Sequence, residues 1–363
     1  MDKFRIDGHK LMYHTPRVND WLKGKLTYPI YAEISPSGIC NHRCVYCALD
    51  FMNYKPRFLN TELFKKRLSE MGTLGLKSVM YAGEGEPLLH KDIGDLILHT
   101  KKVGIDVGIT TNGVLLDESV VDKALESITW IKVSISGATN ETYKRIHRTN
   151  PEDLNRVMKN IRYAVKLKND NNYKTTLGIQ ILLLPENLEE IPLLAEKAKE
   201  IGVDYLVVKP YSQHPLSKTK VYENIEYQDM PWPIKDGYNF LQAVLEDFND
   251  KNFNVIFRAH TMEKWDKRKR NYKTCQALPF WSYIDAGGDI WGCSCYLTDK
   301  RFYYGNIYKN TFKDIWKGEQ RRKSLQWVDS KLDTSKCRVN CRMDEINEYL
   351  SELKNPPDHV NFI

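Results

Sequence analysis

Three cysteines lie close together near the start of the chain. Cys40, Cys44 and Cys47 occur in the segment CNHRCVYC, with three and then two intervening residues. Thiolates are soft ligands, so this spacing suits zinc, with His42 as a fourth ligand, or an iron–sulfur cluster with one position open to another group. Zinc sites usually contain two close cysteine pairs, which favours the iron–sulfur interpretation.

The other five cysteines lie in the last quarter of the chain: Cys275, Cys293, Cys295, Cys337 and Cys341. The turn Gly287-Gly288-Asp289 predicts a hairpin with Cys293 at its exit. The N-terminus lacks the apolar stretch of a signal peptide, so we expect a cytoplasmic protein whose thiols stay reduced. This segment is therefore predicted to be a small metal-binding domain, and zinc is the alternative to a cluster.

Short apolar segments alternate with amphipathic ones through the first two thirds of the chain. The predicted strands are Ile30–Ile34, Ser78–Ala82, Val107–Thr111, Ile131–Ile135, Leu177–Leu184 and Tyr205–Val208. The predicted helices are Asn60–Met71, Asp92–Val103, Glu118–Leu125, Leu154–Lys168 and Leu188–Ile201. This alternation predicts a parallel sheet, either open or closed into a full or partial barrel. The first cysteine cluster follows the first strand and so lies at the ligand-binding edge.

The alternation ends near Tyr211. A helix near Tyr238–Phe248 and a basic stretch, Lys264–Lys273, precede Cys275, and a terminal helix is predicted near Asp344–Leu353. We therefore predict an N-terminal extension (1–27), a barrel domain (28–235), a connecting helical region (236–274) and a C-terminal metal-binding domain (275–363).

The composition is that of a folded globular protein. The 363 residues are 42% hydrophobic and 28% charged. No stretch approaches the ~18 apolar residues of a membrane span, so no membrane association is expected. The net charge of +7 is too mild to predict a nucleic-acid partner, although it is compatible with a phosphorylated substrate.

The Cys-x3-Cys-x2-Cys spacing, with Tyr46 before the last cysteine, resembles the hallmark of the radical S-adenosylmethionine (SAM) superfamily. The resemblance implies that Cys40, Cys44 and Cys47 hold three irons of a [4Fe–4S] cluster and that SAM binds the fourth. It further implies reductive cleavage of SAM to a 5′-deoxyadenosyl radical, with electrons from a donor such as flavodoxin or ferredoxin.

Other strand ends extend the resemblance. Gly83-Glu84-Gly85-Glu86-Pro87 looks like the family's glycine-glycine-glutamate-proline motif, which receives the methionine amino group, although Glu84 replaces a glycine. The cofactor contacts implied by the resemblance are Tyr46, Gly83, Gly85, Glu86, Asn112, Ser134, Arg145, Arg148 and Gln180. For the motif the alternative is a simple turn, and for either arginine it is the solvent face of a helix.

The cysteines of the last quarter are similar to those of the auxiliary-cluster domains called SPASM and twitch. The resemblance implies that Cys275, Cys293, Cys337 and Cys341 hold a second [4Fe–4S] cluster. Cys295 is then left over, as an inert thiol, an alternative ligand or the catalytic hydrogen donor of an epimerase. Gln180 and Lys209 are polar residues in apolar runs, so they are predicted to point into the barrel or toward a ligand, with a hydrogen-bonded core residue as the alternative. Candidate substrate contacts are His214, Arg258 and His260.

These resemblances imply a partial (β/α)6 TIM-like barrel followed by a twitch/SPASM-like iron–sulfur domain. The expected activity is that of a radical SAM oxidoreductase, a dehydrogenase or epimerase of a sugar, aminocyclitol or nucleotide-linked sugar. Few residues precede the first strand, which makes a maturase of a ribosomally made peptide the second hypothesis. A non-catalytic iron–sulfur electron-transfer protein is the third.

Overall fold

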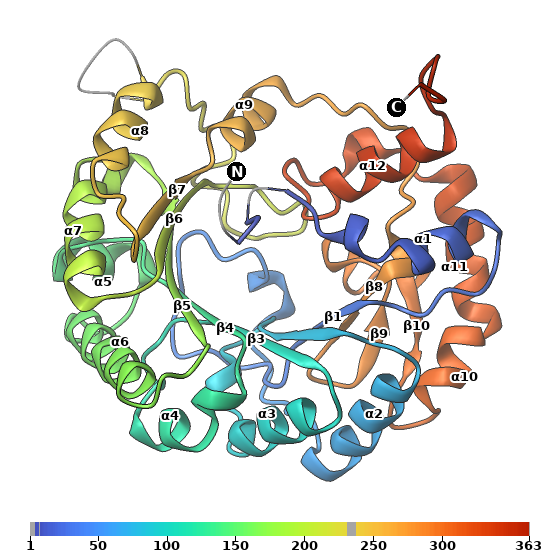
Figure 1. Cartoon of the computed structure of the whole chain (residues 1–363), viewed down its shortest axis with the longest axis horizontal. Coiled ribbons are helices and arrows are strands. Elements are labelled where there is room, and N and C mark those ends of the chain that lie inside the picture. The colour runs from blue at the N-terminus through green and yellow to red at the C-terminus, as the bar shows by residue number, and fades with distance from the viewer. Residues whose placement is uncertain (1–3, 7, 231–236, 363) are drawn as a thin grey trace.

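The computed structural model describes residues 4–6, 8–230 and 237–362. Strands β1 to β6 pair in chain order and run parallel: β1 (Tyr31–Ile34), β2 (Ser78–Tyr81), β3 (Asp106–Thr111), β4 (Trp130–Ser134), β5 (Thr176–Leu183) and β6 (Tyr205–Pro210). All six strands predicted from the sequence are present. The sheet curves into an incomplete barrel with helices around its outside (Figure 1), which confirms the partial TIM-like barrel.

The helices between these strands are α2 (Thr61–Thr73), α3 (Ile93–Lys102), α4 (Glu118–Ala124), α5 (Asn140–His147), α6 (Asp153–Asp170) and α7 (Ile191–Ile201). The sequence predicts all of them except α5, which is short. Its first turn is held by Thr139, whose hydroxyl accepts from the Thr142 amide, and by the Glu190 carboxylate, which accepts from the Ala138 amide at 2.6 Å. These caps come from α5's own first turn and from a distant residue, so hydrophobic periodicity alone does not reveal the helix.

The sheet is wider than the sequence predicts. Its ten strands run in the order β10-β9-β8-β1-β2-β3-β4-β5-β6-β7. The additional strands are β7 (Asn254–Phe257), parallel to β6, β8 (Trp281–Ile284), parallel to β1, and the antiparallel β9 (Asp289–Trp291) and β10 (Tyr303–Asn306). Strands β8 and β9 form the hairpin predicted around Gly287. The segment that carries the auxiliary cysteines therefore continues the barrel sheet.

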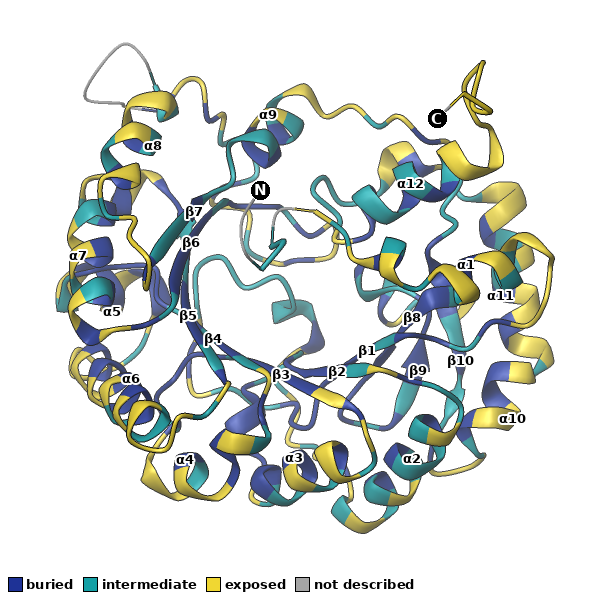
Figure 2. Cartoon of the chain, in the orientation of Figure 1, coloured by how far each residue is buried: buried dark blue, intermediate teal, exposed yellow. Residues whose placement is uncertain are grey.

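Successive side chains of each strand point alternately to the core between sheet and helices and to the barrel interior. On β4, Ile131 and Val133 are buried, in one core with residues of the surrounding helices, whereas Lys132 and Ser134 line an interior cavity. Figure 2 shows the buried residues along the sheet and on the inner sides of the helices, with exposed residues outside. Each fully buried aliphatic side chain contributes about 1.5–3 kcal/mol, so the outer face of the sheet stabilises the fold while its inner face is free to carry polar groups.

The two ends of the chain pack beside the opening of the barrel. The remaining helices are α1 (Thr15–Leu22), α8 (Tyr238–Glu246), α9 (Ala259–Lys267), α10 (Phe312–Lys317), α11 (Glu319–Lys331) and α12 (Asp344–Lys354). Phe4 and Ile6 pack on Tyr205 and Val207 of β6, and Val18 of α1 shares a small core with Leu350 of α12. The predicted boundary between 235 and 236 lies outside the described residues. None of the described helices combines the length and apolar character needed to cross a membrane.

Candidate active site

A cavity of about 750 Å³ occupies the barrel interior. Seven of the nine predicted cofactor contacts line it: Tyr46, Gly83, Gly85, Glu86, Asn112, Ser134 and Gln180. Cys40 and Cys44 line it as well, and Cys47 lies next to them on the same loop between β1 and α2. The parallel strands thus bring together residues that are up to 140 positions apart in the chain.

The first three cysteines do not converge on one point, as the ligands of a single metal ion would. A tetrahedral zinc ion, with Zn–S distances of about 2.3 Å, holds its ligand atoms within about 4 Å of one another. Among the described residues, no three cysteines have their Sγ atoms within 4.8 Å of one another. Burial raises the pKa of the Cys44 thiol, with neighbouring Cys47 and Cys40 adding to the effect, so bound iron would supply the positive charge that keeps these thiols ionised.

The one described group that could hold a single ion consists of His42, Cys44 and His147. His147 is already engaged, because its Nε2 accepts a hydrogen bond from the Ser136 amide at 2.9 Å. Nε2 is therefore the unprotonated nitrogen, and the Nδ1–H donates to Cys44 Sγ at 3.4 Å. His42 Nε2 lies 3.4 Å from Asp153. This group leaves Cys40 and Cys47 unused, so His147 is better described as a hydrogen-bond donor to a cluster thiolate than as a zinc ligand.

Glu86 is held in place by three donors. Its carboxylate accepts from the Thr111 hydroxyl at 2.6 Å, the Asn112 amide at 2.9 Å and the Leu88 amide at 3.1 Å. Burial nevertheless raises the Glu86 pKa to about 7, while these hydrogen bonds lower it. A carboxylate fixed in this way at the edge of the cavity fits the ammonium group of a bound SAM.

The glycines of the same motif allow two loops to pack closely. A Cβ atom on Gly85 would lie 2.2 Å from the Ile39 carbonyl oxygen. On Gly83, at φ +125°, it would lie 2.3 Å from Ser35 Oγ. The motif therefore needs glycine for its contact with the loop that carries Cys40.

The two predicted arginines lie outside the cavity. Helix α5 buries Tyr143, Ile146 and His147, and Arg145 projects from its opposite side and is exposed. Arg148 follows the helix in a left-handed conformation and is exposed as well. Neither lines the cavity, and the structure does not support the predicted cofactor contacts.

Asn112 does lie at the cluster loop, where its side chain donates to Asn41 Oδ1 at 2.7 Å and lies 4.0 Å from Cys40 Sγ.

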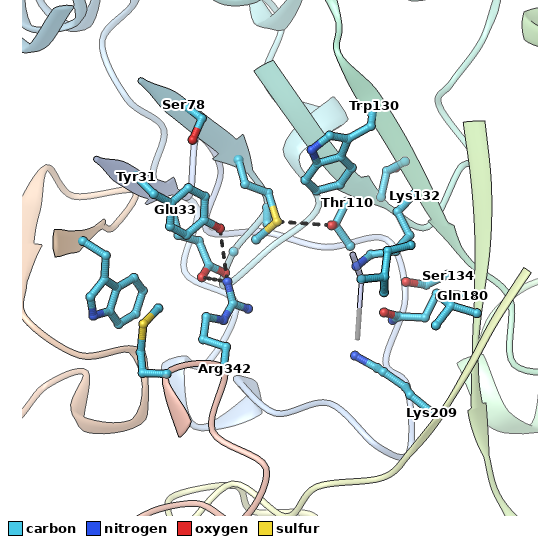
Figure 3. Close-up of a pocket in the computed structure, with 18 of the residues that line it drawn as sticks. Tyr31, Glu33, Ser78, Thr110, Trp130, Lys132, Ser134, Gln180, Lys209 and Arg342 are labelled. Atoms are coloured by element: carbon cyan, nitrogen blue, oxygen red, sulfur yellow. Dashed lines mark hydrogen bonds and ion pairs between the residues drawn. The ribbon is translucent and has the colours of Figure 1, made fainter. Parts of the chain in front are cut away.

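The residues that line the cavity without having been predicted include Tyr31, Glu33, Trp130, Lys132 and Arg342. Figure 3 shows them around the cavity with Lys209 and Gln180. Glu33 pairs with Arg342, which also donates to the Tyr31 hydroxyl at 3.2 Å. A polar or charged residue within an apolar strand is the signal that could have revealed Glu33 and Lys132, because the same signal identifies Gln180 and Lys209. Of the remaining candidate substrate contacts, Arg258 lines the cavity, whereas His214 and His260 do not.

Three of the auxiliary cysteines, Cys275, Cys293 and Cys341, pack against a second apolar core beside the barrel, which includes Trp281 and Phe302. Cys275 and Cys337 each have a polar partner, Asn347 Nδ2 at 3.6 Å and the Tyr296 hydroxyl at 3.4 Å. Burial raises the Cys275 pKa to about 12, with contributions from Cys341 and Cys337.

Cys295 differs from the other cysteines of this group. It is 4% exposed and lies next to Cys293 and Cys341, whereas the other four are partly exposed. Cys295 is not among the residues that line the barrel cavity, where a substrate radical would form. This position favours its description as a buried thiol or a ligand over that of a catalytic hydrogen donor.

Comparison with known proteins decides the family. The radical SAM superfamily matches residues 34–198, and an iron–sulfur cluster-binding domain called SPASM matches residues 275–342. The chain belongs to the radical SAM superfamily. It therefore binds [4Fe–4S] clusters and SAM, as the sequence predicts.

Relatives of this radical SAM protein differ in what they act on. A tungsten-containing aldehyde ferredoxin oxidoreductase cofactor-modifying protein of Pyrococcus furiosus is 25% identical over 315 residues, covering 80% of this chain and 81% of the relative. A probable GTP 3′,8-cyclase of Methanocaldococcus jannaschii is 28% identical over 229 residues, covering 62% of this chain and 68% of the relative.

Solved structures share the fold. Streptococcus suis SuiB bound to SAM superposes with a TM-score of 0.67 at 20% identity, over 95% of this chain and 79% of that one. SuiB bound to the precursor peptide SuiA gives 0.64 at 20% identity, over 85% and 69%. The enzyme anSMEcpe with bound SAM and Cp18Cys peptide gives 0.56 at 19% identity, over 88% of each chain.

Proposed function

We propose that this radical SAM enzyme modifies a peptide substrate in the barrel cavity. The observation that carries the proposal is the shared fold with SuiB, which extends over 85% of this chain to a structure that holds a precursor peptide. The peptide-bound anSMEcpe structure supports the same substrate class. The sequence favours a small polar substrate, and the comparisons favour the peptide hypothesis over it.

The residues in and near the cavity would have different roles. Cys40, Cys44 and Cys47 would hold the first cluster, and Glu86, Asn112 and Ser134 would position SAM. When bound, the cluster and SAM supply a 5′-deoxyadenosyl radical that abstracts hydrogen from a substrate carbon. Cys275, Cys293, Cys337 and Cys341 would hold the auxiliary cluster. The barrel wall would exclude water and stray hydrogen donors.

A small anionic molecule is the second candidate substrate. The cavity is lined by the basic side chains of Lys132, Lys209, Arg258 and Arg342, and Glu33 is the acid that acts on Lys132. Two relatives, the GTP 3′,8-cyclase and the cofactor-modifying protein, carry names that refer to small molecules. A phosphorylated or nucleotide-linked substrate therefore remains compatible with the interior of the barrel.

Isotope transfer tests the proposal. The reconstituted enzyme is incubated anaerobically with dithionite, SAM and a deuterated short peptide encoded beside its gene. We expect deuterium in 5′-deoxyadenosine and a matching mass change in the peptide. A Cys40/Cys44/Cys47→Ala variant should form no 5′-deoxyadenosine. Deuterium transfer from a nucleotide-linked sugar and not from the peptide would replace the proposal with the second candidate.

A further inference from the structure

Two lysines lie on the same wall of the barrel cavity. Lys132 is on β4 and Lys209 on β6, on either side of β5, and Figure 3 shows both side chains extending into the same space, next to Gln180 and Ser134. Both side chains are partly exposed and line the cavity, so the surface that they expose faces its interior.

Neither ammonium group has an anionic partner in the described part of the chain. Lys132 lies 5.5 Å from the centre of the Trp130 ring, and no hydrogen bond or ion pair joins Lys132 or Lys209 to a described residue. Glu33 is the acid that acts on Lys132, and it is already paired with Arg342. An ammonium group enclosed by protein without a counter-ion is costly, so stability of the fold does not explain why two lysines occupy these positions.

The surrounding charges reinforce this imbalance. The Lys132 pKa is lowered to about 8, first by enclosure in the protein and then by Arg342 and Arg258, while Glu33 opposes these effects. The Lys209 pKa is also lowered, by the same enclosure and by Lys132, Arg258, Arg338 and Arg342. A bound anion would relieve this repulsion and stabilise both ammonium groups in their charged form.

We infer that Lys132 and Lys209 form a subsite for an anionic group of the substrate, a carboxylate or a phosphate. Gln180 and Ser134 stand beside the pair as neutral hydrogen-bonding groups. The inference rests on the proposed function in one respect, namely that the substrate enters this cavity. It deepens that function, because it requires an acidic residue or terminus in a peptide, or a phosphate in a small molecule.

The position of the pair separates this subsite from the SAM contacts. Lys132 is one inward-facing position before Ser134, which places it about 6.6 Å farther from the carboxyl edge of the sheet. Glu86 and Asn112 lie at that edge, on the loops that follow β2 and β3. The remaining question is whether the anion belongs to the substrate or to SAM itself, and binding can distinguish the two.

The test uses the reconstituted holoenzyme saturated with SAM. Inorganic phosphate and succinate are titrated as probes by calorimetry into the parent, a Lys132→Met/Lys209→Met variant and a Lys166→Met control. Lys166 is exposed on α6, so the control removes a lysine far from the cavity. SAM affinity and iron content are measured for each protein, and neither readout requires turnover.

We expect the parent to bind at least one probe with an affinity at least tenfold higher than that of the double variant, with SAM affinity unchanged. The Lys166→Met control should match the parent. Binding of phosphate alone, or of succinate alone, supports the subsite and identifies its anion. If the double variant does not fold, Lys132→Gln replaces it, with the same criterion.

Two results would overturn the inference. One is that the parent binds neither probe, or binds it as weakly as the double variant. The other is a loss of SAM affinity in the double variant, which would assign the lysines to the carboxylate of SAM. None of these measurements requires product formation. The binding result therefore tests the anion subsite even if the enzyme does not modify a peptide.

Discussion

Arg57 donates two hydrogen bonds to the buried carboxylate of Glu84, from Nε at 3.1 Å and from a terminal nitrogen at 2.8 Å. The same terminal nitrogen lies 3.5 Å from Asp285, at the end of β8. Glu84 is the residue that departs from the usual glycine in the second motif. The departure thus introduces an ion pair that joins the cluster loop, the motif after β2 and the C-terminal segment.

Loss of Arg57 should destabilise the fold. In Arg57→Ala the side chains of Glu84 and Asp285, each 1% exposed, lose their cation, and an unpaired buried charge costs about 3 kcal/mol. Urea denaturation should show this fall in the free energy of unfolding, partly restored by adding Glu84→Gln. Lys166→Ala, which breaks the exposed pair with Asp170, should cost less than about 0.5 kcal/mol. Equal effects of the two alanine variants would contradict this account.

Iron content should identify the auxiliary ligands. The parent should hold about eight irons per chain, and Cys40/Cys44/Cys47→Ala about four. The four partly exposed thiols of the C-terminal group are the ligands that the resemblance implies, whereas Cys295 is buried beside two of them, Cys293 and Cys341. We therefore expect Cys293→Ala to lose about four irons and Cys295→Ala to lose none, by iron and sulfide analysis. The reverse pattern would make Cys295 the ligand.

His147 should tune the first cluster. Its Nδ1–H donates to Cys44 Sγ, and hydrogen bonds to a cluster sulfur raise its reduction potential. His147→Phe keeps a ring stacked near Tyr143 but removes the donor, so the midpoint potential should become more negative in an EPR-monitored redox titration. The control is His99→Phe, because His99 lies on α3 and bonds only to Ser69. An unchanged potential at full iron content would show that this hydrogen bond is not formed to the ligated thiolate.

The pKa of Lys132 predicts a pH dependence of stability. Its folded-state value is about 8 and its ordinary value 10.5, so between these limits the unfolded chain binds more protons. The free energy of unfolding of the parent should therefore rise with pH across this window, by up to about 3 kcal/mol relative to Lys132→Met. Arg258, Arg342 and Glu33 face Lys132 in both proteins, whereas Lys132→Met also removes the charge that lowers the Lys209 pKa, so the difference between the two urea series reports the coupled pair of lysines. Parallel profiles would contradict the lowered pKa.

The sequence predicts those strands and helices whose pattern of apolar and polar residues is visible within the segment itself. Strands β1 to β6 and their long helices follow from alternation of apolar and polar residues. Strand β8 does not, because its four residues become a strand by pairing with β1, about 250 positions away. The prediction for Arg145 and Arg148 failed for a similar reason, since an arginine suits a carboxylate, but only the phase of α5 and the turn that ends it show that both side chains are exposed. Lys132 and Glu33 interrupt apolar strands, which is a signal in the sequence, but only the folded sheet shows that they line the same cavity.

The pairing of β8 with β1 also constrains how this protein is made. Strand β1 is synthesised early, yet one of its two edges has no partner until Trp281–Ile284 leaves the ribosome. During that interval an apolar strand edge is available to other chains, and contacts of such long sequence separation form slowly. A chain that stops before β8 would keep this edge permanently open, so the N-terminal two thirds should aggregate when produced alone, and synthesis through β8 is needed before the barrel is protected.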